Sequence, residues 1–358
     1  MSFNPSRLAI ARRRKLLKQK DFAKALNVST VTVSHWETAQ AEPSLANIRA
    51  FSRLLGFPSD FFFGTDIDEP TVDQTSFRSQ TSMTAGIRDA SLAAGAIGFL
   101  ICDWIEGRFS LPSPKIPDLQ HFEPDVAART LREEWGLGEK PVSNMIKLLE
   151  SKGVRVFSLA QNTVEVNAYS LWRRSIPYIF LNNFKSAECS RFDAAHELGH
   201  LVLHQDCKMK GREAEDQANR FASSFLMPQA DVLASIPRIS HLGQLIEAKA
   251  RWKVSLAALV HRTHRLGIIS DWKNRDYCIE MGRRGYRSEE PRSIPRESST
   301  VWKRVLNELW KEKTTQAEIA EQLNIPPQEI EGLLFGILQF PASESDIKPE
   351  SIRIAREA

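Results

Sequence analysis

Residues 191–204 read RFDAAHELGHLVLH. On a helix, residues four apart lie on one face, so His196 and His200 can direct two imidazoles at one metal ion, with Glu197 beside them. A catalytic zinc ion takes three protein ligands and a water molecule whose pKa it lowers, and a carboxylate can accept the proton of that water. The HExxH spacing therefore predicts zinc (Zn2+) ligation by His196 and His200, with Glu197 as the base. The alternative is a helix that carries these histidines by chance, because the pattern fixes only three positions.

A third zinc ligand must come from another element. The strongest candidate segment is EAEDQANRFA at residues 213–222, where Ala218 and Phe221 turn one side of a predicted helix inward. Glu215 precedes Ala218 by three positions and shares roughly that side. Spacing favours Glu215 and leaves Glu213 as a competitor.

His204 continues the stripe of His196 and His200. At a rise of ~1.5 Å per residue it would lie about 12 Å along the axis from His196, so one ion cannot reach both on a straight helix. We expect His204 to be a buried structural histidine or one that supports a ligand from behind.

The surroundings of this helix indicate an α+β fold that is mainly helical. Three short runs rich in branched and aromatic residues precede it, at 154–159, 164–172 and 178–181, and predict strands. Helical periodicity covers most of the remaining chain, at 84–107, 123–136, 141–152, 212–226, 240–267 and 301–338.

HELGHLVLH, the later EDQANRFASSFLMP and the preceding strands resemble the ImmA/IrrE family of zinc peptidases over about residues 140–265. The resemblance implies a gluzincin-like domain, in which a small sheet packs on the HExxH helix. It implies His196, His200 and Glu215 as metal ligands and Glu197 as the base. Gln217 stands where many relatives have glutamate, which favours Glu215 as the ligand. Because the family includes proteases that cut helix-turn-helix repressors, the implied substrate is a repressor or antitoxin.

The N-terminal segment QKDFAKALNVSTVTVSHWE, residues 19–37, follows the helix-turn-helix pattern. Ala23 is small where two helices would cross, and Ser29 can cap the second helix. Val28 and Val33 would pack inward. The outward positions of the second helix, which would enter the major groove, are then Thr30, Thr32 and His35.

Residues 6–64 resemble the XRE, or Cro-like, helix-turn-helix family, which implies a five-helix domain and a double-stranded DNA operator as partner. In relatives, the positions of Gln19, Thr30, Thr32 and His35 often touch DNA. A homodimer is compatible with this resemblance, since such readers often bind paired half-sites. The alternative is a protein-interaction module of the same fold that does not read DNA.

The charge of the 358-residue chain is only +4, but residues 1–40 hold eight basic residues against two acidic ones. The pattern predicts either a phosphate-binding patch or a solvated helix face. The basic residues are Arg7, Arg12, Arg13, Arg14, Lys15, Lys18, Lys20 and Lys24.

The cysteines form no CxxC pair, which favours reduced thiols in a cytoplasmic protein; they are Cys102, Cys189, Cys207 and Cys278. The N-terminus has no apolar stretch of signal-peptide length. The most apolar segment, Ala93 to Ile105, contains Asp103 and is too short to span a bilayer. We therefore expect no membrane partner.

We expect four regions: a helix-turn-helix domain at 1–66, a linker at 67–83, a peptidase domain at 84–281, and a linker with a helical C-terminal region at 282–358. Thr315 to Ile330 repeats a helix-turn-helix rhythm without a basic surface. That rhythm favours a packing, sensing or oligomerisation element and leaves a second DNA reader as the alternative.

Together the two resemblances predict a DNA-binding transcriptional regulator with a zinc-dependent endopeptidase domain. It would cleave a repressor or antitoxin, or itself, when a signal arrives. One alternative is a transcription factor whose peptidase-like domain senses a ligand or metal without proteolysis. Another is the peptidase component of a toxin–antitoxin or phage-defence system.

Overall fold

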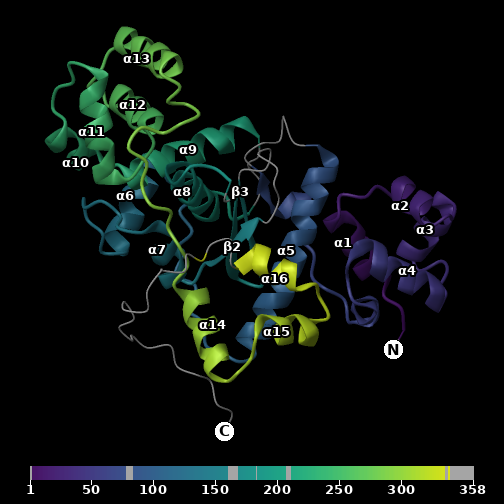
Figure 1. Cartoon of the computed structure of the whole chain (residues 1–358). Coiled ribbons are helices and arrows are strands. Elements are labelled where there is room, and N and C mark those ends of the chain that lie inside the picture. Colours follow the sequence, from purple (N-terminus) through teal and green to yellow (C-terminus); the bar gives the residue numbers. More distant parts are fainter. Residues whose placement is uncertain are drawn as a thin grey trace. The chain divides into compact units, whose positions relative to one another are not determined.

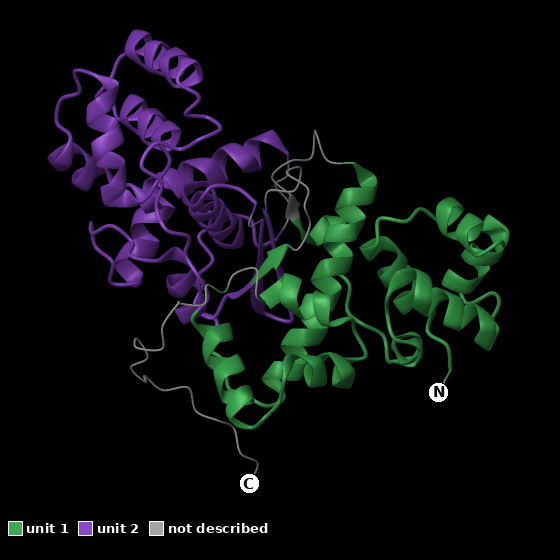
Figure 2. Ribbon diagram, viewed as in Figure 1, with its two compact units in different colours: residues 1–111, 157–166, 300–358 green, residues 112–156, 167–299 purple. Residues whose placement is uncertain are grey.

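The computed structural model describes residues 2–77, 84–159, 168–182, 184–206, 211–334 and 338. The chain forms two compact units, which Figure 2 colours separately. Unit 1 consists of residues 1–111, 157–166 and 300–358, and unit 2 of residues 112–156 and 167–299. The chain thus returns to unit 1 after first leaving it, whereas the sequence suggested regions that follow one another in order.

Unit 1 contains the N-terminal helices, one long apolar helix and the C-terminal helices (Figure 1). Its elements are α1 (Pro5–Arg14), α2 (Gln19–Ala25), α3 (Thr30–Glu37), α4 (Leu45–Leu55), the 3₁₀ helices η1 (Ser59–Phe63) and η2 (Val72–Gln74), β1 (Ser76–Phe77), α5 (Ala85–Glu106), α14 (Val301–Lys311), α15 (Gln316–Leu323) and α16 (Pro327–Leu334).

The N-terminal bundle is closed by local signals and an aromatic core. Ser29 accepts a hydrogen bond from the backbone N–H of Thr32 at the start of α3, and Gly56 ends α4 with φ of 73°. The ring of Phe51 lies 5.6 Å from that of Phe22 and 5.1 Å from that of Trp36. The expected five-helix domain therefore consists of four α-helices and η1, which packs against α1 and α4.

Helix α5 has 22 residues, which is longer than the apolar segment recognised in the sequence. By length and composition alone it could cross a membrane, so the expectation that this segment is too short was wrong. Most of its apolar stretch is buried, and α1, α15 and α16 pack against it within unit 1. This burial is what the core helix of a folded unit would also show.

Unit 2 holds the HELGH segment and most of the strands that the sequence predicts. Its elements are α6 (Pro124–Glu134), α7 (Met145–Ser151), β3 (Ala168–Arg173), β4 (Ile176–Asn182), α8 (Ala187–Leu203), α9 (Arg212–Leu226), α10 (Gln229–Ser235), α11 (Leu242–Trp252), α12 (Leu256–Arg265) and α13 (Asp271–Arg283); β2 (Arg155–Leu159) begins in unit 2 and ends in unit 1.

Strands β3 and β4 form an antiparallel hairpin, with Ala168 opposite Leu181 and Arg173 opposite Ile176. The two turn residues, Arg174 and Ser175, have φ of 49° and 64°. Positive φ at both positions is the geometry that matches the twist of a two-residue hairpin. The predicted strand at 164–172 is thus confirmed from residue 168 on, while 164–167 lie outside the described residues.

Helix α8 packs against α9, β3 and β4. Gly199, the glycine of HELGH, allows the close approach of α8 and α9. A Cβ at this position would lie 3.1 Å from Phe221 Cδ1 and 3.2 Å from the Cα of Ala218. The two helices that carry the predicted metal ligands can therefore cross this closely only because Gly199 has no side chain.

The segment after α13, which the sequence suggested was a linker, belongs to unit 2. Its acidic side chains bind it to helices of that unit. Glu290 accepts from the backbone N–H of Leu256 at the start of α12. Glu297 accepts from the backbone N–H of Met145 at the start of α7 and pairs with the buried Arg191 of α8. Such carboxylates satisfy backbone donors that a helix leaves open at its N-terminus.

Candidate metal centre and candidate nucleic-acid interface

The donor atoms of His196, His200 and Glu215 converge. All lie within 4.8 Å of one another. The two Nε2 atoms are 3.1 Å apart, and each lies 3.4 Å from a carboxylate oxygen of Glu215. Ligands placed tetrahedrally at zinc-ligand distances would be separated by ~3.3 Å. The spacing of this donor set fits one zinc ion.

Helix geometry brings these ligands together as the spacing suggested. His196 and His200 project from one face of α8, where their side chains are 0% and 3% exposed. Glu215 projects from the first turn of α9, and its side chain is 25% exposed. Glu213 is exposed and is not part of the cluster. The site is thus open to solvent on the side of Glu215.

Hydrogen bonds behind His196 determine which of its nitrogens can bind metal. Its Nδ1 lies 3.0 Å from Oδ1 of Asn219 on α9. An amide oxygen can only accept, so Nδ1 carries the proton and Nε2 keeps its lone pair. That lone pair is directed toward His200 and Glu215.

His200 is oriented by a longer chain of contacts. Nε2 of His204 lies 3.0 Å from Oε1 of Gln217, so this nitrogen is the donor. Nδ1 of His204 then accepts from Nδ1 of His200, 3.0 Å away, which leaves Nε2 of His200 with a lone pair. The two lone pairs that face each other across 3.1 Å repel unless a cation lies between them.

His204 is therefore a buried histidine that supports His200 from behind. It caps the C-terminus of α8, which ends at Leu203. Burial and the neighbouring His200 lower the pKa of His204, and the hydrogen bond from His204 to Gln217 opposes this shift. The neutral ring that the hydrogen-bond chain requires is consistent with this direction.

Glu215 is ionised at neutral pH. Burial raises its pKa, but the contacts with His196 and His200 outweigh burial and lower the pKa to about 2. A carboxylate that stays charged is a suitable third ligand for a divalent cation, which would take the place of ring protons between the two imidazoles.

Glu197 is completely buried, and its Oε2 accepts a hydrogen bond of 2.7 Å from the hydroxyl of Ser170 on β3. Ser170 thus fixes the carboxylate that follows the first histidine. Ser170 and Asn219 were not recognised in the sequence. A serine in a strand and an asparagine on a polar helix face carry no motif, and their role comes from the packing of β3 and α9 on α8.

Of the predicted DNA-reading residues, Thr30, Thr32 and His35 lie on α3 and Gln19 begins α2, but not all of their side chains are free to contact DNA. Thr30 is exposed. The hydroxyl of Thr32 lies 2.8 Å from that of Ser29 at the helix cap, and His35 is half-buried. Gln19 donates to Glu37 at 2.8 Å. Only Thr30 therefore has a side chain that is both exposed and without a hydrogen bond to another described residue.

Val31 was not among the outward-facing residues that the sequence predicted. Its side chain is 61% exposed, at the second position of α3. A branched apolar side chain at the N-terminal end of a recognition helix can contact the methyl group of thymine. Val31 joins Thr30 as a candidate base contact.

The basic N-terminal segment divides into internal arginines and exposed lysines. Arg7 donates to the carbonyls of Phe61 and Thr65, and the remaining three arginines pair with carboxylates within unit 1. These pairs are Arg12–Glu37, Arg13–Glu69 and Arg14–Glu329. The exposed positive charge is left to Lys15, Lys18, Lys20 and Lys24.

Comparison with known proteins agrees with both parts of this description. Residues 8–62 match the family model described as helix-turn-helix, and residues 149–264 match the one described as IrrE N-terminal-like domain. Over 62 residues the chain is 44% identical to the HTH-type transcriptional regulator DicA of Escherichia coli (strain K12). The match covers 16% of this chain and 46% of that protein, so this chain spans less than half of the length of the relative.

Proposed function

We propose that this protein is a DNA-binding regulator with zinc endopeptidase activity. The reason is that one chain joins an XRE-type helix-turn-helix domain to an ImmA/IrrE-type peptidase domain. The observation that carries the proposal is the convergence of three donor atoms from His196, His200 and Glu215 at distances suited to zinc. The hydrogen bonds from Asn219 and His204 support it, since they leave metal-binding lone pairs on both histidines.

The catalytic role belongs to Glu197. Zinc, when bound, supplies a Lewis acid that lowers the pKa of a water molecule and polarises the peptide carbonyl. Glu197 accepts the proton of the attacking water and passes it to the leaving nitrogen. Ser170 holds the carboxylate through Oε2 during both transfers.

The substrate that we propose is a helix-turn-helix repressor or an antitoxin, with the chain itself as a further possible target. The N-terminal domain supports this restricted role, because a DNA reader confines the peptidase to operators and to proteins bound there. We expect the protein in the cytoplasm, where operator DNA is found.

A second function is a transcription factor whose peptidase-like domain senses a ligand without proteolysis. The complete burial of Glu197 is the observation that favours it, since a general base must reach substrate. The peptidase proposal therefore requires that substrate or a signal opens the space next to Glu197.

Cleavage assays with wild type and Glu197→Gln separate the two functions. Each protein, loaded with zinc, is incubated with repressors encoded near its gene, and the products are identified by mass spectrometry. We expect wild type to cut one partner, and Glu197→Gln to bind zinc equally but not to cut. The sensor function replaces the peptidase if wild type binds zinc and cuts neither a partner nor itself. This must hold both in the purified assay with added nucleotides and in cells whose DNA has been damaged.

A further inference from the structure

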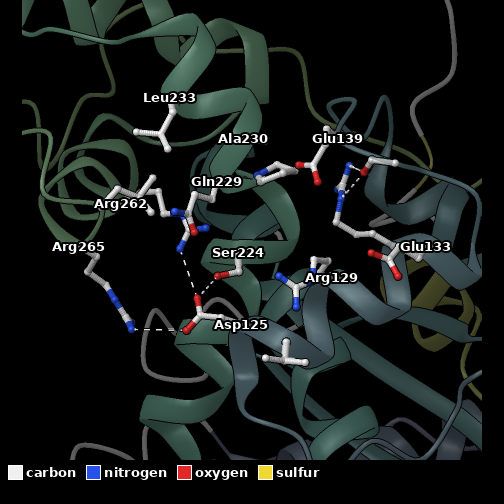
Figure 3. A pocket seen from close by; sticks show the side chains of 15 residues that line it. Asp125, Arg129, Glu133, Glu139, Ser224, Gln229, Ala230, Leu233, Arg262 and Arg265 are labelled. Atoms are coloured by element: carbon white, nitrogen blue, oxygen red, sulfur yellow. Dashed lines mark hydrogen bonds and ion pairs between the residues drawn. The ribbon is translucent and has the colours of Figure 1, made fainter.

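A cavity lies in unit 2 and is lined by residues other than the predicted metal ligands. Its volume is about 680 Å³, within the range of small-molecule sites. Figure 3 shows its walls, which come from α6, the C-terminal end of α9, α10 and α12. Ser224 in this wall and Glu215 at the metal centre lie roughly 14 Å apart along the axis of α9.

Around Asp125, arginine side chains outnumber the carboxylate. Asp125 of α6 lies 3.4 Å from Arg262 and 3.8 Å from Arg265, both of α12. It also lies 3.0 Å from Arg220 and accepts a hydrogen bond from Ser224. Burial would raise the pKa of Asp125, but these donors lower it, so the group is a carboxylate.

Arg129 adds a guanidinium that is not committed to the fold. It is exposed, one helical turn after Asp125, and forms no hydrogen bond or ion pair with any residue that the structure describes. Figure 3 shows its side chain reaching into the cavity toward Ser224. By contrast, Arg132 in the same lining donates to the carbonyls of Phe225 and Gly138.

Three guanidinium groups gather here, two that share the carboxylate of Asp125 and one, Arg129, that does not, and they favour a ligand with several anionic oxygens. Planar guanidinium forks of Arg129, Arg262 and Arg265 match phosphate oxygens and remain charged at every relevant pH. A phosphate bound among these three arginines would add negative charge beside the single carboxylate of Asp125, while Glu133 and Glu139 also line the cavity.

The rest of the lining indicates what the phosphate is attached to. Val126, Leu233 and Leu266 supply apolar surface. Glu133 and Glu139 are exposed residues of the same lining, and ionised carboxylates accept hydrogen bonds from hydroxyl groups. A compact body with hydroxyl groups would satisfy both.

We infer that this cavity binds a small phosphate-bearing molecule, held through its phosphate by Arg129, Arg262 and Arg265. The inference does not rest on peptidase activity, because the cavity and the metal ligands are separate sets of residues.

Isothermal titration calorimetry of the full chain tests it with inorganic phosphate, glycerol 3-phosphate and adenosine monophosphate, beside glycerol and adenosine. We expect at least one phosphorylated probe to bind and the two uncharged molecules not to bind. Arg129→Gln should weaken that binding by about tenfold or more, because one charge-assisted fork is lost. The matched variant Arg238→Gln, at an exposed arginine outside the cavity, should bind as wild type does.

Binding must also persist in Glu215→Ala, which separates this cavity from phosphate that coordinates a metal ion. The inference fails if no phosphorylated probe binds at roughly 10 mM, well above common affinities. It also fails if Arg129→Gln binds as tightly as Arg238→Gln, or if adenosine binds as tightly as its monophosphate. Which phosphorylated probe binds best decides between free phosphate and a phosphate ester.

Discussion

The orientation of two imidazole rings is the residue-scale feature on which the metal centre depends. Asn219 and Gln217 each present an amide oxygen to a ring nitrogen, one directly behind His196 and one through His204 to His200. The sequence predicted the two histidines of the proposed metal site, because HExxH has a fixed helical spacing. It could not indicate these amides, since their contacts arise only when α9 packs on α8.

We predict that Gln217→Ala weakens zinc binding by roughly 10- to 100-fold, as is common when the group behind a metal-bound histidine is removed. Without the amide oxygen, His204 can place its proton on Nδ1, and His200 then loses the ring orientation that the ion needs. Competition with a chromogenic chelator measures the affinity.

The control for this change is Glu213→Ala, because Glu213 is exposed on the same helix and is not part of the cluster. It should leave the zinc affinity unchanged. Equal affinities of Gln217→Ala and Glu213→Ala would contradict a role for the hydrogen-bond chain.

At the DNA-reading helix, we predict that Thr30→Ala and Val31→Ala each weaken binding to the promoter of the gene by roughly tenfold. Both side chains are exposed, so their loss would remove the proposed base contacts and leave the core intact. Fluorescence anisotropy with a labelled promoter fragment measures the affinity. Leu45→Ala is the matched control, since Leu45 is 69% exposed on α4; a loss as large as that of Val31→Ala would refute the assignment.

At the scale of elements, the arginines of α1 are structural. Arg12 donates to Leu17 O and pairs with Glu37 of α3, and the two side chains are only 10% and 7% exposed. The net charge of the segment predicted a phosphate-binding patch or a solvated face, and for the arginines neither holds. Charge counted along the sequence cannot distinguish a buried pair from a surface one, because the acidic partner lies on another helix.

We predict that Glu37→Ala raises the rate of amide exchange in α3 by roughly 100-fold. The change leaves Arg12 buried without its partner, which costs about 3 kcal/mol or more. Hydrogen–deuterium exchange followed by mass spectrometry reports it for residues 30–37. Glu69→Ala is the comparison, because the Arg13–Glu69 pair is more exposed and its loss should cost about 1 kcal/mol or less. If α3 exchanges equally fast in both variants, the Arg12–Glu37 pair does not hold α1 to α3.

The crossing of α8 and α9 gives a second prediction at this scale. Gly199→Val places atoms against Phe221 and the backbone of Ala218, so α9 must move away and carry Glu215 with it. We expect zinc affinity to fall by about tenfold or more. Gly282→Val is the matched control, since a Cβ at Gly282 of α13 meets nothing within 4 Å. Unchanged affinity in Gly199→Val would show that the close approach does not position the ligand.

At the scale of the whole molecule, most helices and the strands of the hairpin were predictable, whereas α10, α13 and the way in which distant segments return were not. Local periodicity identified α9 from Arg212 to Leu226 with the bounds that the structure has. The segment after α13 has turn-forming composition and suggested a linker, but Glu297 pairs with Arg191 more than a hundred positions earlier. No local pattern reports such a contact.

We predict that Glu297→Ala lowers the melting temperature of the protein by roughly 5–10 °C, because buried Arg191 loses its charged partner and α7 loses its N-terminal acceptor. Differential scanning calorimetry measures the shift. Glu289→Ala, at an exposed neighbouring position, should change it by about 1 °C or less. A Glu297→Ala protein as stable as Glu289→Ala would mean that the segment does not hold unit 2 together.

Zinc content, measured by inductively coupled plasma mass spectrometry on the purified full chain, tests the metal centre most directly. We predict about one zinc ion per chain in wild type and in Glu213→Ala, and almost none in Glu215→Ala or His200→Ala. Circular dichroism confirms that the variants are folded. A folded Glu215→Ala protein that keeps as much zinc as wild type would contradict the assignment of His196, His200 and Glu215 as the ligands.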